Sequence, residues 1–539
     1  YYASRGLGDV YKRQIYMCLK KIVFFIVSVV LLCPHLLAVQ MECNIPQTDN
    51  VGAEVMPQFI EPFHNLPFKM HLLKYPTFPD YTVNVKDYAI TANKPITELV
   101  NRLIMETCQK GGGKVVIPAG KWKSGRIVLK SNVNLHLEEG AEIEFSGNPK
   151  DYLPSVYTMH EGRQIISSGS FIYAFNEKNI AITGKGRIYG PPMDLPIRKN
   201  SNSIAWIEKD FPERIEERIF DGMDGRRFFA PKVIAPVQCK DVLIEGMIIE
   251  RCMFWNINPI LCENVIIRGV TVNSVGIPSG DGVDITCSKN VLVEYCTMNC
   301  GDDCYAIKGG RNEEGARMGI SAENVIIRNC LAKAGHGGLT TGSETGGGIK
   351  NIYAYNCVFD GTDMPLRFKT RRPRTGITEN IFYERLRIKN VNTVFVWDLL
   401  GSYNFVGELA NRLPLRPVTK LTPTVRNVCV KNFIVESANC FISARGIPEL
   451  PISNIQIEDG IVQCENLMPI MHDFENFTLR NLSIVSKQNK IHVLEGKKML
   501  MENIKFSLPE NKLYLKVEGE QSEDINFKNI HPNIEIIKE

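Results

Sequence analysis

The sequence has 539 residues, of which 44% are hydrophobic and 23% charged, and its formal net charge is +4. This composition is typical of a folded protein and excludes a largely disordered chain. Residues 1–38 carry five basic side chains and one acidic one, so the rest of the chain is close to neutral. A nucleic-acid partner is therefore not expected, because proteins of that class show a strong basic excess.

The N-terminal residues divide into segments that precede the main domain. Residues 1–16 resemble a translated sequencing adapter and are left out of the fold prediction. Residues 17–40 combine Lys20 and Lys21 with the apolar run Ile22–Leu32, as a secretory signal peptide does. That run is shorter than the roughly 20 residues of a membrane helix. We therefore expect a secreted or periplasmic protein with no membrane span after signal cleavage.

Residues 41–83 are rich in Pro and Phe without clear periodicity, and we expect an N-terminal arm that lies on the fold. Residues 84–539 are expected to form one main domain. Asn84–Tyr88 is typical of a strand, and a helical pattern runs from Thr97, a plausible N-cap, to Cys108. Such a helix ahead of a long β region is expected to cap the open end of a repeated β-structure.

A repeat of Asn or Asp followed by alternating apolar residues runs through the main domain. From Asp241 onward, neighbouring starts are mostly about 22 to 29 residues apart, which is the period of a parallel β-helix. Leucine-rich repeats share this period, but their leucine spacing and helix pattern are missing. The repeats start at Asn179, Asp241, Asn264, Asn290, Asn324, Asn351, Asn380, Asn427, Asn454, Asn476 and Asn503. The predicted fold is an all-β parallel β-helix, a solenoid, with an N-terminal capping helix.

Counting from each Asn predicts what stacks inside the coil. Offsets +1 and +3 are apolar in successive repeats, and offset +6 places Cys296, Cys330 and Cys357 on three consecutive ones. Stacked side chains point in parallel and make poor disulfide geometry, so buried free thiols are favoured. The Asn series itself is interpreted as a structural ladder at a turn.

Polar clusters interrupt the apolar pattern. Asp302 and His336 share the offset +12 and should emerge at one corner of adjacent coils, and allowing for extra residues around Val275–Ser279 brings Asp281 into line with Asp302. Carboxylates held together raise one another's proton affinity, so one can remain an acid while another acts as a base. That pairing is what cleavage of a glycosidic bond needs.

More ordinary roles are open for these side chains. Aspartates beside glycines are common in turns, and His336 could be a structural histidine. Arg367 and Lys369 come from the next repeat and would suit a substrate with its own carboxylate, but they could also be solvated charges.

Outside these clusters the polar and aromatic side chains are less distinctive. The basic run of Arg371, Arg372 and Arg374 fits a solvated surface as well as a substrate site. Tyr403 and Trp397 could line a sugar subsite, although interior packing is the favoured interpretation.

Together the clusters resemble the four signature motifs of the polygalacturonases of glycoside hydrolase family 28, in the pectin lyase-like β-helix superfamily. The motifs are Gly280-Asp281-Gly282-Val283-Asp284, Gly301-Asp302-Asp303-Cys304, Gly335-His336-Gly337-Gly338 and Arg367-Phe368-Lys369. The segments from Gly111 to Gly120 and from Leu135 to Ala141 are also similar, so the resemblance covers about Asn84 to Ser507.

The resemblance implies a right-handed parallel β-helix that hydrolyses α-linked galacturonosyl bonds of pectin with inversion. It implies Asp302 as general acid, Asp281 with Asp303 as the pair that activates water, and His336 as a group that tunes the acid's protonation. The two cations of the last motif would hold galacturonate carboxylates. No cofactor or metal is implied, and the expected partner is an acidic plant cell-wall polysaccharide or oligosaccharide, bound by a monomer.

Three positions depart from the family pattern, and all are expected near the substrate. Ser279 stands where Asn is usual, Asn258 where many bacterial relatives have His, and Arg372–Thr375 where a glycine-rich run often follows. Insertions over Pro191–Lys232 and Ser402–Pro423 could close one end of a groove, which predicts an exo-acting enzyme.

Three competing functions stay open. The substrate could be a rhamnogalacturonan-type or decorated pectic oligosaccharide. A pectate lyase shares the β-helix but needs calcium-binding acids and a basic residue that abstracts the C5 proton. A glycan-binding β-helix would bind such polymers without turnover.

Overall fold

The computed structural model describes residues 44–89, 94–199 and 203–538. The adapter and signal-peptide predictions for residues 1–16 and 17–40 lie outside these ranges. The chain divides into two units, Tyr1–Ile45 and Pro46–Glu539, and the second contains all the elements discussed below. Within the described ranges, every helix is too short or too polar to cross a bilayer.

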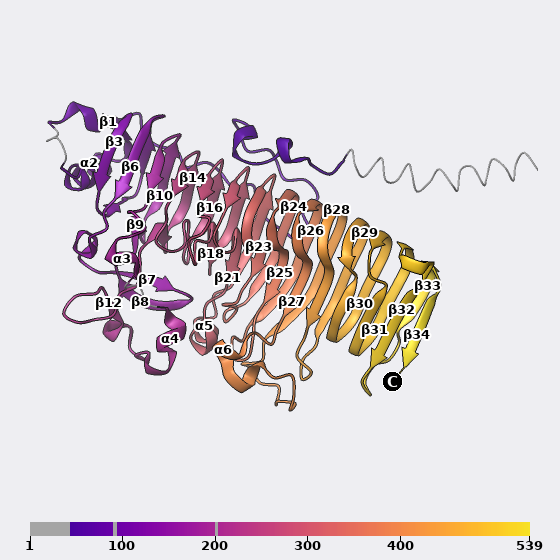
Figure 1. Cartoon of the computed structure of the whole chain (residues 1–539). Coiled ribbons are helices and arrows are strands. Elements are labelled where there is room, and N and C mark those ends of the chain that lie inside the picture. Colours follow the sequence, from indigo (N-terminus) through magenta and orange to yellow (C-terminus); the bar gives the residue numbers. More distant parts are fainter. Residues whose placement is uncertain (1–43, 90–93, 200–202, 539) are drawn as a thin grey trace, which may run out of the picture. The chain divides into compact units, whose positions relative to one another are not determined.

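Parallel strands dominate the second unit and form three hydrogen-bonded ladders, seen as rows of arrows in Figure 1. A strand pairs with the strand one repeat earlier and with the strand one repeat later, so each coil of the chain stacks on the next. Val265, for example, pairs with Val242 on one side and Val291 on the other. The predicted all-β fold of stacked parallel strands is confirmed, and the hand of the coil stays a prediction.

The ladders share several long strands that bend from one ladder into another. The first ladder runs through β1 (Thr82–Asn84), β2 (Gly113–Ile117), β5 (Val133–Leu137), β10 (Lys178–Gly184), β14 (Lys240–Glu245), β16 (Glu263–Arg268), β19 (Lys289–Glu294), β22 (Ala322–Arg328), β24 (Ile349–Asp360), β26 (Ile377–Lys389), β28 (Thr424–Arg445), β29 (Ile452–Asn466), β30 (Met468–Ser486), β31 (Lys490–Ser507) and β33 (Asn526–His531). The second runs through β3 (Gly120–Ser124), β6 (Ala141–Phe145), β11 (Arg187–Tyr189), β15 (Ile248–Glu250), β17 (Thr271–Asn273), β20 (Thr297–Asn299) and the start of β23 (Leu331–Thr341). The third begins with the separate sheet of β4 (Ile127–Val128), β9 (Ser170–Phe175) and β13 (Lys232–Val237), which bridges at Ile257 join to the next strand. It continues through β18 (Val283–Thr286), β21 (Tyr305–Lys308), the end of β23, β25 (Thr362–Lys369) and β27 (Val391–Asp398), then through parts of β28, β30 and β31 to β32 (Leu513–Glu518) and β34 (Ile534–Lys538).

The Asn series forms the predicted turn ladder. The Asn264 amide donates to Asp241 over 2.8 Å, Asn290 to Asn264 over 3.2 Å and Asn324 to Asn290 over 3.1 Å. Each of these residues has a φ between 54° and 57°, a left-handed conformation that Asn tolerates better than most residues. The repeat therefore marks one corner of the coil and leaves the catalytic chemistry to other residues.

The interior contains the predicted thiols. Cys296, Cys330 and Cys357 are free and buried in the main apolar cluster. Burial raises the pKa of Cys296 and of Cys357 well above the usual value of a thiol. These cysteines act as small apolar side chains in the core.

Two local predictions ahead of the coil are wrong. Asn84–Tyr88 is not a strand, because β1 ends at Asn84 and a 3₁₀ turn follows over Val85–Asp87. The helix α2 (Thr97–Gln109) exists, but Ile96 is its N-cap. The Thr97 hydroxyl accepts the Gly125 N–H over 2.6 Å and so ties the helix to the coil instead. Apolar residues of α2 such as Val100 and Ile104 join the main core cluster.

The segment before β1 packs along the outside of the first ladder. Apolar side chains of this arm, including Phe63 and Leu66, cover the outward-facing Leu243, Ile266 and Leu292. Beneath the arm, Glu294 lies between two arginines whose Nε and Nη2 atoms, on Arg268 and Arg328 respectively, are each 2.7 Å from its carboxylate. All three side chains are buried.

We expect Glu294→Gln to lower the free energy of unfolding by about 3 to 5 kcal/mol, because it leaves two buried guanidinium groups without their shared counter-charge. Urea denaturation followed by circular dichroism measures the change. Glu323→Gln is the control, since the Glu323–Lys350 pair is partly exposed and should contribute at most about 1 kcal/mol. A loss no larger than that of the control would contradict this account of the buried triad.

Short elements inserted between the ladders gather at one side of the strands, near the ends of β21, β25 and β27 (Figure 1). The strands β7 (Val156–His160) and β8 (Arg163–Ser167) form an antiparallel hairpin, and β12 (Ile219–Phe220) pairs with β8. The helical elements there are α3 (Pro196–Lys199), α4 (Ile204–Ile207), α5 (Asn312–Met318) and α6 (Tyr403–Val406). Buried ion pairs join these elements to one another, as where Glu314 of α5 lies 2.9 Å from Arg218 and 3.0 Å from Arg163.

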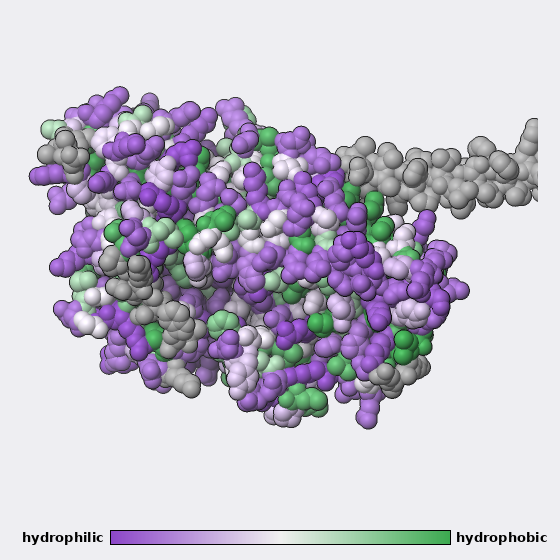
Figure 2. All heavy atoms as spheres, viewed as in Figure 1, coloured by the Kyte–Doolittle hydropathy of each residue, from purple (hydrophilic) through white to green (hydrophobic). Residues whose placement is uncertain are grey.

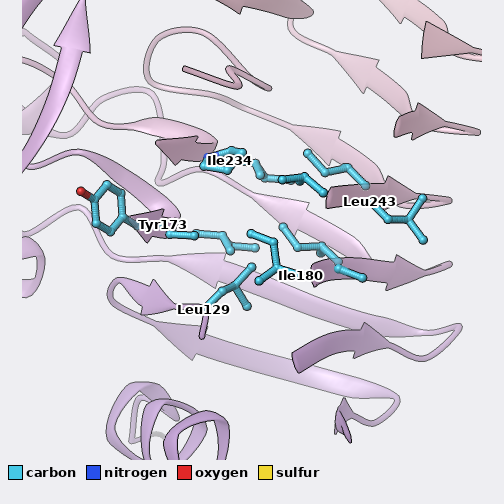
Figure 3. A pocket seen from close by; sticks show the side chains of 12 residues that line it. Leu129, Tyr173, Ile180, Ile234 and Leu243 are labelled. Carbon is cyan, nitrogen blue, oxygen red and sulfur yellow. The ribbon is translucent and has the colours of Figure 1, made fainter. Parts of the chain in front are cut away.

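Neither the visible surface nor the interior void marks a binding site by its hydropathy. The face shown in Figure 2 is mostly hydrophilic, with hydrophobic residues in small separate groups. An interior void has a volume of about 10 Å³. Its lining includes Leu129, Ile180 and Leu243, which are labelled in Figure 3. This void has room for about one water molecule. Its lining contains none of the acids that cleavage of a glycosidic bond needs.

Candidate active site

The ends of three stacked strands bring the predicted acids together. Val283 of β18 pairs with Tyr305 of β21, and Tyr305 pairs with Leu339 of β23. Asp281 and Asp303 each lie two residues before the first of these pairs, so the same register sets them opposite each other. The Gly282 N–H donates to the Asp303 carbonyl over 2.9 Å.

The predicted alignment of Asp281 with Asp302 is therefore wrong by one residue. The turn between β17 and β18, closed by the Gly280 N–H donating to the Ile277 carbonyl over 3.0 Å, takes up one residue fewer than expected. Asp302 lines up with His336 as predicted, and the His336 N–H donates to the Asp302 carbonyl over 3.0 Å.

The three carboxylates form a tight cluster. One oxygen of each of Asp281, Asp302 and Asp303 lies within 4.8 Å of those of the other two. Asp281 and Asp303 are buried, while Asp302 is partly exposed. Three acids this close cannot all titrate independently, so the surrounding charges decide which of them carries a proton.

Cations on β25 hold Asp303 in its ionised form. Lys369 Nζ lies 2.7 Å from Asp303 Oδ2, and Arg367 Nη1 lies 3.5 Å from Oδ1. The Thr340 hydroxyl also donates to Oδ1 over 2.9 Å. Burial alone would raise the pKa of Asp303, but Lys369, Arg367 and Lys308 outweigh it and hold that pKa well below its usual value.

A second group of charges lies beneath Asp281. Lys308 Nζ is buried 3.4 Å from Asp284, 3.5 Å from Glu344 and 4.0 Å from Asp281. Its charge also lies 4.6 Å from the centre of the Trp255 ring. Burial raises the pKa of Asp284 to about 7 although Lys308 opposes it, and burial with Asp284 and Asp302 raises the pKa of Asp281 well above its usual value.

The sequence analysis did not single out Lys308, Asp284 or Glu344 as site residues. A lysine at the end of the otherwise apolar strand β21 was the signal available for Lys308, because a buried cation there requires buried acids nearby. Asp284 lay within a quoted motif, three residues after Asp281. Glu344 had no signal, since it reaches the site from the turn that follows β23.

His336 lies at the rim of the cluster. Its ring is 44% exposed, and Nδ1 is 3.1 Å from Asp363 Oδ2. The described contact of the ring is therefore with Asp363, and only its main chain is bonded to Asp302.

The acids open into a pocket of about 390 Å³ that also contains Arg367 and Lys369. Ser203 and Phe405, one from each predicted insertion, contribute to its wall. Glu161, at the tip of the β7–β8 hairpin, forms a further part that the sequence analysis missed. A pocket closed by insertions has room for a sugar unit and is lined by both acids and cations.

Comparisons with known proteins agree with this site. Residues 108–399, more than half of the chain, match Glycosyl hydrolases family 28. The chain belongs to this family. Family 28 membership makes it a glycoside hydrolase, and all four of its predicted motifs lie inside the matched region.

Three similar proteins accompany the family match. A probable polygalacturonase of Vitis vinifera is 25% identical over 65% of this chain and 67% of its own length. An exo-poly-alpha-D-galacturonosidase of Dickeya chrysanthemi is 26% identical over 60% of this chain and 57% of its own length. The structure of a hyperthermoactive exopolygalacturonase from Thermotoga maritima superposes with a TM-score of 0.65 and 29% identity, covering 78% of this chain and 93% of that one.

Two of the three departures from the family 28 pattern lie at the pocket. Ser279 and Arg374 line it. Asn258 does not, and the prediction for it is wrong: it is fully buried, with its amide donating to the Thr286 hydroxyl over 2.9 Å. Asn258 therefore supports the strand that carries Asp284.

The prediction that both aromatic side chains pack in the interior is confirmed for one and wrong for the other. Trp397 is fully buried and stacks on Phe368 with 5.1 Å between ring centres, which confirms interior packing. Tyr403 is 61% exposed, so packing is the wrong interpretation for that residue. It belongs to α6, an insertion that projects from the coil.

The charge on Lys369 yields a pH prediction for this hydrolase. A carboxylate with a lowered pKa stays ionised down to low pH, and a reaction that needs its ionised form slows only when it is protonated. Removing the cation in Lys369→Met should raise the pKa of Asp303, so the acid limb of the kcat/KM profile should move to higher pH by about one unit or more. The profile is measured on a pectic oligosaccharide.

Lys389→Met is the control for that profile, because Lys389 pairs with Asp360 at a distance of 3.3 Å outside the pocket. Its acid limb should coincide with that of the unaltered protein. If the Lys369→Met limb stays in place while only the absolute rate falls, Lys369 does not control the protonation of Asp303.

Proposed function

We propose that this family 28 hydrolase is an exo-acting polygalacturonase, which removes galacturonosyl units from the end of a pectic chain by cleaving α-linked bonds with inversion. The observation that carries the proposal is the cluster of three carboxylates within 4.8 Å in a pocket lined by cations and walled by insertions. The names of the Vitis, Dickeya and Thermotoga proteins support the substrate class.

The electrostatics of the cluster support the roles of the three acids. Asp302, partly exposed at the pocket, is assigned as the general acid that protonates the leaving oxygen. Asp281 and Asp303 are assigned to the attacking water. Because the pKa of Asp303 is lowered and that of Asp281 is raised, Asp303 is the ionised base and Asp281 orients the water. His336 is assigned to tune the protonation of Asp302, as the family resemblance implies, from its place at the rim of the cluster.

Arg367 and Lys369 are assigned to galacturonate carboxylates. Both contact Asp303 in the structure, so a substrate carboxylate would share them with the base. Arg367 has donor atoms to spare, since its Nε and Nη1 are buried without a hydrogen-bond acceptor among the described residues. A carboxylate of the substrate would satisfy such donors.

Exo action is supported by the walls of the pocket. Ser203, Phe405 and Glu161 come from three separate insertions, and the polymer must enter past them. An endo-acting enzyme needs a groove open at both ends so that a long chain can lie across it. The pocket suits the terminal sugar of a chain.

The remaining features of the proposal concern the whole molecule. We assign the ladders to a right-handed parallel β-helix with α2 covering its first coil, residues 84–539 to the catalytic domain, and residues 41–83 to an arm. The protein acts as a secreted or periplasmic monomer on an acidic plant cell-wall glycan. Its secretion rests on the apolar leader of residues 17–40.

Early product size tests the proposal. The protein is incubated with polygalacturonate and, separately, with rhamnogalacturonan, each with and without a calcium chelator, and the first products are separated by size. Single galacturonate units from polygalacturonate, unaffected by the chelator, are the expected result. Oligomers of mixed size would show an endo-acting enzyme, and products with a new double bond that require calcium would show a lyase.

A hydrolase for rhamnogalacturonan-type or decorated oligosaccharides is the second candidate. It is favoured by Ser279 and Arg374, which line the pocket and depart from the family pattern. Product from rhamnogalacturonan alone would select it. Binding of either polymer without product would select the glycan-binding alternative.

A further inference from the structure

The cations of the pocket are not equally matched by acids of the protein. Arg311 lies 2.7 Å from Glu208, Lys308 lies 3.4 Å from Asp284, and Arg374 lies 3.5 Å from Glu344. Arg367 and Lys369 both contact Asp303, as described above. Among the described residues, the guanidinium of Arg371 alone of these six cations has no hydrogen bond or ion pair.

The Arg371 side chain is nevertheless held in one place. Its Cζ lies 4.8 Å from the centre of the Phe405 ring, the geometry of a cation–π contact. On the other side it packs against Gly401, where an added Cβ would lie 2.8 Å from Arg371 Cδ. Phe405 belongs to the Ser402–Pro423 insertion and Gly401 directly precedes it, so the segment that follows β27 positions this arginine at the pocket.

The neighbouring arginine has a different function. Arg372 contacts Glu449 with two nitrogens, at 2.5 and 2.6 Å, and donates to the Leu409 and Asn411 carbonyls. Arg372 thus fixes the fold of the insertion and has no donor directed at the pocket. Of the three arginines in the basic run, Arg372 therefore has a structural role, Arg374 pairs with Glu344, and Arg371 is available for a ligand.

An unmatched, half-buried guanidinium lacks the compensation that the other cations have. Burial lowers the pKa of Arg371, and Glu344 and Asp398 offset this only in part. A planar anion that accepts two parallel hydrogen bonds is the ligand that suits such a group best. In a hydrolase for pectic chains, that anion is a uronate carboxylate.

We propose that Arg371, held between Phe405 and Gly401, binds the carboxylate of the terminal galacturonosyl residue and selects chains that end in a uronate. This specificity site is separate from Arg367 and Lys369, which contact Asp303. The inference rests on the proposed exo-polygalacturonase function and names the group by which the chain end is recognised.

The test compares two trisaccharides, trigalacturonate and a derivative whose terminal non-reducing carboxylate is reduced to a neutral alcohol. For Arg371→Ala, kcat/KM on trigalacturonate should fall about 10- to 100-fold, the effect of losing hydrogen bonds to a charged group. On the neutral-ended trisaccharide it should change less than about 2-fold. Arg371→Lys should recover only part of the loss, because Lys lacks the planar fork.

Lys420→Ala is the matched control, since Lys420 is an exposed cation of the same insertion that does not line the pocket. It should leave both substrates unaffected. Equal losses on the two trisaccharides in Arg371→Ala, or no loss on either, would overturn the proposal while hydrolysis of trigalacturonate by the unaltered protein still upheld the proposed function.

If the unaltered protein cleaves neither trisaccharide, the proposed function fails, and calorimetry still decides the fate of this site. Galacturonate and galactose are titrated into the unaltered protein and into Arg371→Ala. Binding of galacturonate that weakens about 10-fold or more in the variant supports a carboxylate site at Arg371. Binding that is unchanged, or absent from both proteins, overturns it.

Discussion

Asp302→Asn is expected to lower kcat on polygalacturonate by about 10²- to 10⁴-fold, because it removes the proton that the leaving oxygen must receive. The substitution is nearly isosteric and lies at a partly exposed position, so the fold should persist. Release of galacturonate is measured with a reducing-sugar assay, and circular dichroism checks the fold. Asp87→Asn, at an exposed position on a 3₁₀ turn outside the pocket, should retain full activity.

A second substrate separates the acid from a general loss of structure. In an aryl galacturonide whose phenol is strongly acidic, the phenolate leaves without being protonated. Asp302→Asn should therefore cleave this substrate at close to the normal rate. If the variant lost both activities equally, Asp302 would not be the general acid.

Gly337→Ala is expected to lower kcat/KM by about 100-fold although no charged group is changed. A Cβ at this position would overlap Asp303 Oδ1 and the Thr340 hydroxyl. The bond from Thr340 and the contacts from β25 fix the carboxylate of Asp303, so the added methyl group must displace the base from its place. A displacement of about 1 Å is enough for a loss of this size.

The control for Gly337→Ala is Gly225→Ala in an exposed loop of the first insertion. Gly225 has a φ of 76° with nothing within 4 Å of an added Cβ, so Ala there is strained without touching the site. It should lower the melting temperature slightly and leave kcat/KM unchanged. Normal activity in Gly337→Ala would show that the base tolerates a shift, contrary to the geometry of the cluster.

The repeat could be predicted from the sequence because one physical requirement recurs in every coil. Each coil turns at a left-handed residue whose side chain must bond to its neighbour, and Asn meets both conditions, as Asn264 and Asn290 do. Because the repeat is regular, counting from each Asn also placed the acids on adjacent coils. The exact alignment of Asp281 could not be predicted, since it depends on how many residues the turn before β18 absorbs.

The parts of the site that escaped prediction come from segments outside the repeat. Glu161 lies in a tight antiparallel hairpin whose turn, Glu161-Gly162, has positive φ at both residues. That pair between two apolar runs could have indicated the hairpin, but not where it packs. Glu344 and Arg371 follow strands at irregular turns. Only the folded chain shows that Glu344 completes the buried charges around Lys308, while Arg371 stacks on Phe405 without an acidic partner among the described residues.

The most direct measurement of the central claim is a proton NMR time course of polygalacturonate hydrolysis, recorded as soon as the protein is added. The account predicts that signals of single galacturonate units appear first, as the β anomer produced by inversion of an α bond, and that Asp302→Asn abolishes them. The carboxylates lie closer together than the roughly 6.5 to 9.5 Å usual in inverting enzymes. The anomer of the first product is therefore a demanding test of the proposed inversion. The α anomer as first product, or internal oligomers ahead of the monomer, would contradict the account.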